Sequence, residues 1–145
     1  MDKYDCLKLE NQICFPLYVA AKEVVRKYKP FLDELDLTYT QYIAMMVIWQ
    51  EKKLHVTELG KRLYLDTGTI SPLIRKLREK NYITLSRDKE DERVQIIEIT
   101  KDGEELRDRA VSVPLAMQKN NCVNLTVEEA IALKKTLEKI IGIKQ

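Results

Sequence analysis

A cysteine and a tyrosine stand four residues apart near the start of the chain, in the stretch ENQICFPLY at residues 10–18. Pro16 lies between them, and proline fits best in the first turn of a helix because it lacks a backbone N–H. A helix is therefore expected to begin within residues 12–15, with Cys14 and Tyr18 on one face. A phenol O–H and the free N–H groups of a first turn both favour a thiolate, which predicts a reactive Cys14. The alternative is that Cys14 is a small buried core residue.

The other residues that could do covalent or metal chemistry are few. Besides Cys14 the chain has Cys6 and Cys122, and an odd number of cysteines without a CxxC pair argues against a disulfide framework in a reducing compartment. His55 is the single histidine, so no zinc site and no other cofactor is expected. The sequence lacks a Gly-rich phosphate loop, a GxSxG or HExxH motif and a catalytic dyad. An enzyme is therefore the class that the sequence favours least.

Length and composition indicate a folded protein outside the membrane. The chain has 145 residues, 45% of them hydrophobic and 33% charged, which suits one domain or one subunit of an interlocked dimer. No apolar run approaches the ~18 residues that span a bilayer, and residues 1–10 are charged throughout, unlike a signal peptide. We therefore expect a cytoplasmic protein without a membrane partner.

With only four glycines and four prolines, most of the sequence is helical in pattern. Residues 29–41 predict a break followed by a short helix. Residues 40–51 are apolar almost all round, which predicts a buried central helix. A long helix is expected from its N-cap Thr100 to residue 120, with a bend or an end at Pro114.

The last predicted helix opens with Thr126 and Glu129, which have the spacing of a capping box. It carries more apolar positions than a lone surface helix needs, namely Ile131, Leu133, Leu137, Ile140 and Ile141. A helix from a second subunit is therefore expected to cover it.

The middle of the chain predicts a DNA-binding unit. Residues 55–65 and 66–82 indicate two short helices across a tight connection, and residues 82–87 and 93–100 indicate two strands joined by a charged turn. This order is a winged helix-turn-helix, so the expected fold class is mainly α with a two-stranded β-wing and long helices at both ends. Residues 51–93 hold eleven Lys or Arg against eight Asp or Glu, which favours a polyanionic partner.

Side chains at the start of the second short helix are placed to meet base edges in the major groove of double-stranded DNA. The predicted DNA-binding residues on this helix are Thr67, Thr69, Ser71, Arg75 and Lys76. The hairpin adds Arg87 and Arg93, either of which can enter the minor groove, where the negative potential is strongest. The alternative is that residues 66–80 form an ordinary solvated amphipathic helix.

Two stretches resemble the MarR family of regulators. ELGKRLYLDTGTISPLIRKLREKNYI resembles the family's helix-turn-helix, and SRDKEDERVQIIEIT resembles its wing, with Asp91 and Arg93 matching the Asp-x-Arg motif. LENQICF, LTYTQY and LYLDTGTISPLIRKL resemble one branch more closely, the organic-hydroperoxide repressors (OhrR) and related one-cysteine redox regulators. Pro16 departs from the pattern of that branch.

The resemblance implies an architecture for the whole chain, 1–145. Segments 1–39 and 101–145 would form dimerisation helices, and segment 40–100 would form the DNA-binding region. Because a homodimer has two-fold symmetry, it would bind a pseudo-palindromic operator in double-stranded DNA.

The resemblance also implies a redox sensor. In that branch the cysteine that matches Cys14 reacts with peroxide, and it is surrounded by two tyrosines of its own subunit and one of the partner. Carried over, these tyrosines are Tyr18, Tyr28 and Tyr39; the alternative for each of them is ordinary core packing. A second cysteine late in the chain resolves the oxidised one in some members, which makes Cys122 a possible resolving residue, with Cys6 or a small thiol as rivals.

Three hypotheses for function remain at this point. The first is a repressor that leaves its operator when an organic hydroperoxide oxidises Cys14 to a sulfenic acid. The second is a MarR-type regulator that binds a small aromatic ligand and does no redox chemistry. The third, a thiol peroxidase, is weakened because no CxxC accompanies the reactive cysteine.

Overall fold

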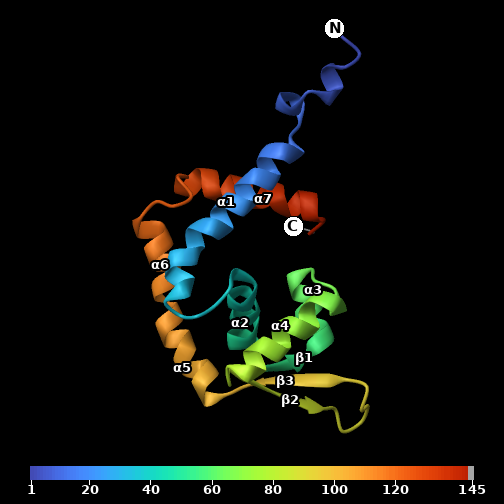
Figure 1. Ribbon diagram of the computed structural model, residues 1–145, viewed down its shortest axis with the longest axis vertical. Coiled ribbons are helices and arrows are strands. Elements are labelled where there is room, and N and C mark those ends of the chain that lie inside the picture. The colour runs from blue at the N-terminus through green and yellow to red at the C-terminus, as the bar shows by residue number, and fades with distance from the viewer. Residues whose placement is uncertain (144–145) are drawn as a thin grey trace.

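The computed structural model describes residues 1–143 and shows a helical protein with one small sheet (Figure 1). Residues 144 and 145, which end the predicted segment 101–145, lie outside the described residues. In chain order the elements are η1 (Asp5–Leu7), η2 (Leu9–Asn11), α1 (Cys14–Asp33), α2 (Tyr39–Glu51), β1 (Lys53–His55), α3 (Val56–Leu63), α4 (Thr67–Glu79), β2 (Ile83–Arg87), β3 (Gln95–Ile99), α5 (Lys101–Ala110), α6 (Ser112–Lys119) and α7 (Val127–Ile141). This order confirms a mainly helical winged helix-turn-helix fold with helices before and after it.

Helix α2 lies at the centre of the fold, because its sequence is apolar almost all round. Helices α1, α3, α4 and α5 and strands β1 and β3 all contact it. Its buried residues are Gln41, Tyr42, Ala44, Met45, Val47, Ile48 and Trp49. A capping box closes its N-terminus, since Gln41 N donates to Thr38 Oγ1 at 3.2 Å and Thr38 N donates to Gln41 Oε1 at 3.1 Å. The predicted buried central helix is confirmed.

The sheet has three antiparallel strands in the order β1–β3–β2. Strands β2 and β3 form the predicted hairpin, with Leu85 opposite Ile97. The sequence did not predict β1, which pairs Leu54 with Ile97 on the other side of β3. A strand of three residues is too short to show the alternation by which strands are recognised.

Helix α1 begins at Cys14 and has Pro16 in its first turn, as predicted. The helix then continues through Pro30 to Asp33, so the predicted break falls later than expected, between Asp33 and Tyr39, and the separate short helix within residues 29–41 does not form. Pro30 lies in the last turn of α1, where its missing N–H removes one backbone hydrogen bond. Burial of the Leu32 side chain, which is 2% exposed, outweighs that loss.

The C-terminal helices begin and end where their sequence signals indicate. Helix α5 ends at Ala110 and α6 begins at Ser112, so the long helix is interrupted near Pro114. Helix α7 begins with the expected capping box, because Glu129 N donates to Thr126 Oγ1 and Thr126 N donates to Glu129 Oε1, both at 3.1 Å. Both predictions are confirmed.

The terminal helices expose apolar side chains that the chain itself does not cover. Every residue of α7 is described and none is buried, while Leu32 is the one buried residue of α1. The exposed apolar residues of these two helices include Phe15, Leu17, Val25, Val127, Ile131, Leu133, Ile140 and Ile141. Among the described residues, no helix is long and apolar enough to cross a membrane. The apolar excess at the chain ends is therefore a surface feature of the single chain.

Helix α5 is held against the sheet by a close approach that only glycine permits. Trp49 Nε1 donates a buried hydrogen bond of 2.8 Å to the carbonyl oxygen of Gly103. A Cβ atom at Gly103 would overlap the carbonyl oxygen of Tyr82 and come within 2.7 Å of Ile99 Cγ1. The start of α5 is thereby fixed to both α2 and the end of the hairpin.

Replacing Gly103 with alanine should therefore destabilise the fold by about 3 kcal/mol, because the backbone of Tyr82 cannot move aside cheaply. The measurement is urea unfolding followed by circular dichroism. Gly68→Ala is the matched control, since its new Cβ would meet only Asp66 Oδ1, at 3.5 Å. The control should keep or slightly raise stability, because alanine favours a helix. Equal unfolding midpoints for the Gly103→Ala variant and the wild type would contradict the close approach.

Candidate DNA-binding surface and redox site

Helix α4 buries one face and presents the other to solvent. Its buried residues are Ile70, Leu73, Ile74 and Leu77, which are the predicted apolar stripe. Asp66 caps the helix, since its Oδ1 accepts from Thr69 N at 2.9 Å. Thr67, Ser71 and Arg75 recur every four residues and so lie along one exposed face, while Thr69 and Lys76 are also exposed. All five predicted residues of α4 are therefore available to a partner.

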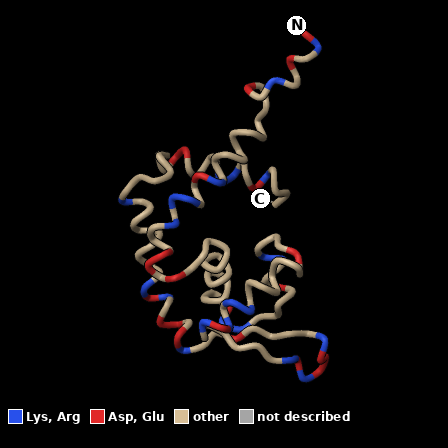
Figure 2. The backbone as a smooth tube through the Cα atoms, in the orientation of Figure 1, with Lys and Arg blue, Asp and Glu red and all other residues tan. Residues whose placement is uncertain are grey.

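The wing presents one arginine in a fixed orientation. Arg93 Nε and Nη2 donate to the two carboxylate oxygens of Asp91 at 3.0 and 3.2 Å, yet the Arg93 side chain stays 90% exposed. The hydrogen bonds from Arg93 lower the pKa of Asp91 from its ordinary value. Arg87 Nη1 donates to Glu92 O at 3.2 Å and thereby closes the same turn. Figure 2 shows basic residues both at the wing tip and along α4.

A groove of about 690 Å³ lies between α3, the start of α4 and the wing. Its lining brings together three of the predicted DNA-binding residues, Thr67, Ser71 and Arg93. Thr69, Arg75, Lys76 and Arg87 do not line it. The lining also includes five polar residues that the sequence analysis missed, namely Thr57, Lys61, Tyr64, Asp66 and Gln95. The sequence does not reveal these residues, because they line one groove only once the hairpin packs beside the two helices.

Cys14 is exposed and is the first residue of α1. Among residues 1–143 no side chain caps this helix end, so its first N–H groups are open to a negative charge. Tyr18, one turn further on, is 61% exposed, and Lys22 Nζ lies 4.5 Å from the centre of its ring. Cys14, Tyr18 and Lys22 therefore form one stripe along α1. The single chain does not bury Cys14 in its core.

Tyr28 and Tyr39 lie together, but away from Cys14. Their ring centres are 5.2 Å apart, and Tyr42, which the sequence analysis did not select, lies 5.9 Å from Tyr28. Fourteen residues of helix separate Cys14 from Tyr28, a distance of roughly 21 Å at the usual helical rise. Within one chain Tyr28 and the neighbouring Tyr39 therefore lie far from Cys14, while Tyr18 lies one helical turn from it.

Burial raises the pKa of two phenols in this group, Tyr28 and Tyr42. Burial raises the pKa of Tyr42 to about 12, and neighbouring Tyr28 and Tyr39 add to the effect. Burial, followed by the proximity of Tyr39 and Cys122, also raises the pKa of Tyr28. Tyr28 and Tyr42 therefore offer neutral O–H donors near neutral pH.

Cys122 lies beside this tyrosine cluster rather than in a free polar loop. Lys27 Nζ on α1 donates to the carbonyl oxygen of Cys122 at 2.6 Å, and Cys122 N donates to Met117 O at 3.1 Å. The side chain is half-buried, and it is close enough to Tyr28 to affect that residue's pKa. The connection between α6 and α7 is thereby held against α1.

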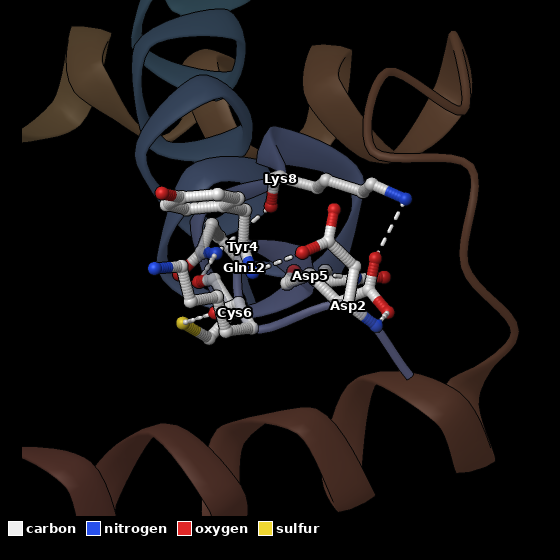
Figure 3. Close-up of polar contacts among 8 residues, drawn as sticks. Asp2, Tyr4, Asp5, Cys6, Lys8 and Gln12 are labelled. Carbon is white, nitrogen blue, oxygen red and sulfur yellow. Dashed lines mark hydrogen bonds and ion pairs between the residues drawn. The ribbon is translucent and has the colours of Figure 1, made fainter.

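Cys6 belongs to an N-terminal arm that lies beyond α1 and is held together by its own hydrogen bonds (Figure 3). Gln12 Nε2 donates to Cys6 O at 2.7 Å and to Lys8 O at 2.8 Å, and Cys6 Sγ lies 3.4 Å from Lys3 O. The Cys6 thiol is exposed. Within residues 1–143, no three His, Cys, Asp or Glu side chains gather in a way that could hold a metal ion.

Comparison with known sequences identifies the protein family. A family model described as "Transcriptional regulator SarA/Rot" matches residues 26–110, which include α2, the helix-turn-helix and the wing. The chain belongs to the SarA/Rot family of transcriptional regulators. This SarA/Rot-family regulator is 43% identical over 113 residues to the "Organic hydroperoxide resistance transcriptional regulator" of Bacillus subtilis, covering 78% of this chain and 77% of that one. It is 41% identical over 134 residues to the regulator SarZ of Staphylococcus saprophyticus, covering 92% and 90%.

Solved structures show the same fold. Reduced AbfR bound to DNA, from Staphylococcus epidermidis, matches with a TM-score of 0.80 at 23% identity, over 97% of this chain and 96% of that one. A mutant MarR from Escherichia coli, complexed with operator DNA, matches with a TM-score of 0.81 at 19% identity, over 97% and 99%. The expected resemblance to MarR-type and hydroperoxide-related regulators is confirmed. The SarA/Rot-family chain is a DNA-binding transcriptional regulator of the MarR and SarZ type, and these relatives are regulators rather than enzymes.

Replacing Arg93 with alanine should weaken DNA binding by roughly 1–3 kcal/mol and make affinity less dependent on salt, because each lost phosphate contact lowers the log–log slope by about 0.9. The measurement is fluorescence anisotropy at several salt concentrations, with a duplex that the wild-type protein selects from a random-sequence library. Arg26→Ala is the control, since Arg26 pairs with Glu23 on α1 and lies outside the wing. Wild-type affinity in the Arg93→Ala protein would show that Arg93 of the wing does not contribute to DNA binding.

Proposed function

We propose that the protein is a cytoplasmic homodimeric repressor that leaves its operator when an organic hydroperoxide oxidises Cys14. The observation that carries the proposal is the placement of an exposed cysteine at an uncapped helix N-terminus with a tyrosine on the next turn. The Bacillus subtilis relative, which is named for organic hydroperoxide resistance, supports the same class of oxidant.

The dimer is supported by the uncovered apolar faces of α1 and α7. A second copy of the chain would bury both faces, which is the largest gain of apolar contact open to this surface. Since Cys14 lies roughly 21 Å along α1 from Tyr28, the tyrosine cluster and Cys122 would be brought to Cys14 by the partner subunit. Two symmetric DNA-binding units would then require a pseudo-palindromic duplex.

The oxidation step is a nucleophilic attack. The Cys14 thiolate attacks the terminal oxygen of the hydroperoxide, the O–O bond breaks, and the departing alkoxide takes a proton and leaves as an alcohol. The sulfur gains the oxygen and becomes a sulfenic acid. A thiolate, with Cys122 of the partner subunit as the first candidate, then attacks this sulfur and forms a disulfide. The S–O bond breaks, and the departing hydroxide takes a proton and leaves as water.

A path from the tyrosine cluster to α4 supports release of DNA. Tyr39 belongs to the first turn of α2, whose capping residue Gln41 is 6% exposed. Gln41 Oε1 accepts from Lys80 Nζ at 3.1 Å, and Lys80 also donates to the carbonyl oxygen of Asp36. Lys80 is the C-cap of α4. A shift of the first turn of α2 on oxidation would therefore displace α4 and change the spacing of the two recognition helices.

A second candidate function is the binding of a small aromatic carboxylate without redox chemistry. A groove of about 360 Å³ lies between α2 and α5, and its lining includes Tyr42, Trp49 and Arg107. Two aromatic rings and one guanidinium group suit such a ligand. Benzoate is a simple probe: release of DNA from the Cys14→Ser protein by benzoate would favour this second function.

The Cys14→Ser protein should bind the selected duplex as tightly as wild type does but should stay bound in cumene hydroperoxide. Serine has nearly the size of cysteine and keeps a hydrogen-bonding group toward Tyr18, while its hydroxyl cannot take oxygen from a peroxide. The measurement is an electrophoretic mobility shift with and without the hydroperoxide. Cys6→Ser is the control and should still release DNA. Peroxide-driven release of the Cys14→Ser protein would show that Cys14 is not the sensor.

Cys122→Ser should respond to hydroperoxide at first but lose reversibility. Because Cys122 lies far from Cys14 along the same chain, the disulfide should join two subunits and appear as a covalent dimer on a non-reducing gel. Without Cys122, intact-mass spectrometry should show Cys14 advancing to the sulfinic and sulfonic acids. A covalent dimer that persists in Cys122→Ser and disappears in Cys6→Ser would assign the resolving role to Cys6.

A further inference from the structure

Tyr64 stands in the turn between α3 and α4 in a conformation that its side chain does not favour. Its backbone has φ 56° and ψ 39°, the left-handed region, which glycine or asparagine occupies at lower energy. The turn is closed by backbone groups alone, since Leu65 N donates to Gly60 O at 3.0 Å. The Tyr64 side chain is 67% exposed. Neither the turn nor the core therefore accounts for a tyrosine at this position.

The Tyr64 side chain lines the groove between α3, α4 and the wing. Lys61, one turn earlier on α3, lines the same groove, and Ser71 and Arg93 line it from α4 and the wing. Every one of these side chains ends in a hydrogen-bond donor. The one carboxylate of the lining, Asp66, is the N-cap of α4, and its Oδ1 accepts from Thr69 N. A groove with donors on each side suits a chain of acceptors.

The geometry of a winged helix places such a chain of acceptors in this groove. When α4 enters the major groove and the wing reaches the neighbouring minor groove, one sugar–phosphate strand separates the two elements. Phosphate oxygens are acceptors, and tyrosine is among the side chains that bind them. A neutral phenol adds a directed hydrogen bond there without adding charge.

We propose that Tyr64 donates its phenol O–H to a phosphate oxygen of the DNA strand that runs between α4 and the wing. The inference rests on the proposed DNA-binding surface and adds to it a contact with the sugar–phosphate backbone of the DNA. Tyr64 contributes affinity but does not discriminate bases, because the phosphate is the same in every sequence. Arg93, on the opposite side of the groove, supplies charge to the same strand.

The test compares Tyr64→Phe with wild type by fluorescence anisotropy, on the selected duplex and on a scrambled duplex of equal length and composition. Loss of one hydrogen bond per subunit should weaken binding to both duplexes by a similar factor, about tenfold. The salt dependence should stay unchanged, since no charge is removed. Tyr64→Asn, which suits the left-handed backbone, should lose at least as much affinity while keeping the wild-type melting temperature.

Tyr4→Phe is the matched control, because Tyr4 is also exposed but belongs to the N-terminal arm. It should bind both duplexes as wild type does. Full affinity of Tyr64→Phe, together with weakened binding by Arg93→Ala, would overturn the role of Tyr64 and leave the DNA-binding surface standing. A loss confined to the selected duplex would make Tyr64 a base reader and overturn the phosphate contact. Full affinity of both variants would instead show that the groove is not part of the DNA-binding surface.

Discussion

The rest of the structure depends on the burial of α2, a helix that is apolar almost all round. Such a helix is stable in water only when other elements cover every side of it. Helices α1, α3, α4 and α5 and two strands meet that requirement, and each of them thereby takes a defined place. The contacts at its two ends follow from the same position: Gln41 meets Lys80 at one end, and Trp49 meets Gly103 at the other.

The burial of α2 also explains why the two ends of the chain differ from its middle. The core cluster extends from Leu32 to Val113 and is formed mainly by α2 to α6, so α7 contributes no buried residue and α1 only Leu32. The exposed apolar residues of α1 and α7 are not covered by other parts of the same chain. In the proposed dimer the partner subunit would cover them. The dimer would also bring the cysteine at the start of one α1 close to the tyrosines near the end of the other.

Redox sensing and DNA binding are proposed for opposite ends of the molecule, and α2 lies between them. Its first turn holds Tyr39 on the side of the tyrosine cluster and Gln41 on the side of α4. Because the interior is closely packed, a small displacement of this turn cannot be absorbed locally. The proposed groove for the DNA strand, which both Tyr64 and Arg93 line, lies between α3, the start of α4 and the wing.

The sequence by itself determined the elements and the exposed face of α4, because apolar periodicity and capping residues act over a few neighbouring positions. Thr126 with Glu129, Pro16 and the stripe from Ile70 to Leu77 are of this kind. Only the tertiary structure decided the continuation of α1 through Pro30, the short strand β1 and the placement of Cys122 beside Tyr28. Each of these depends on contacts between residues far apart in the chain, whose energies outweigh local preference.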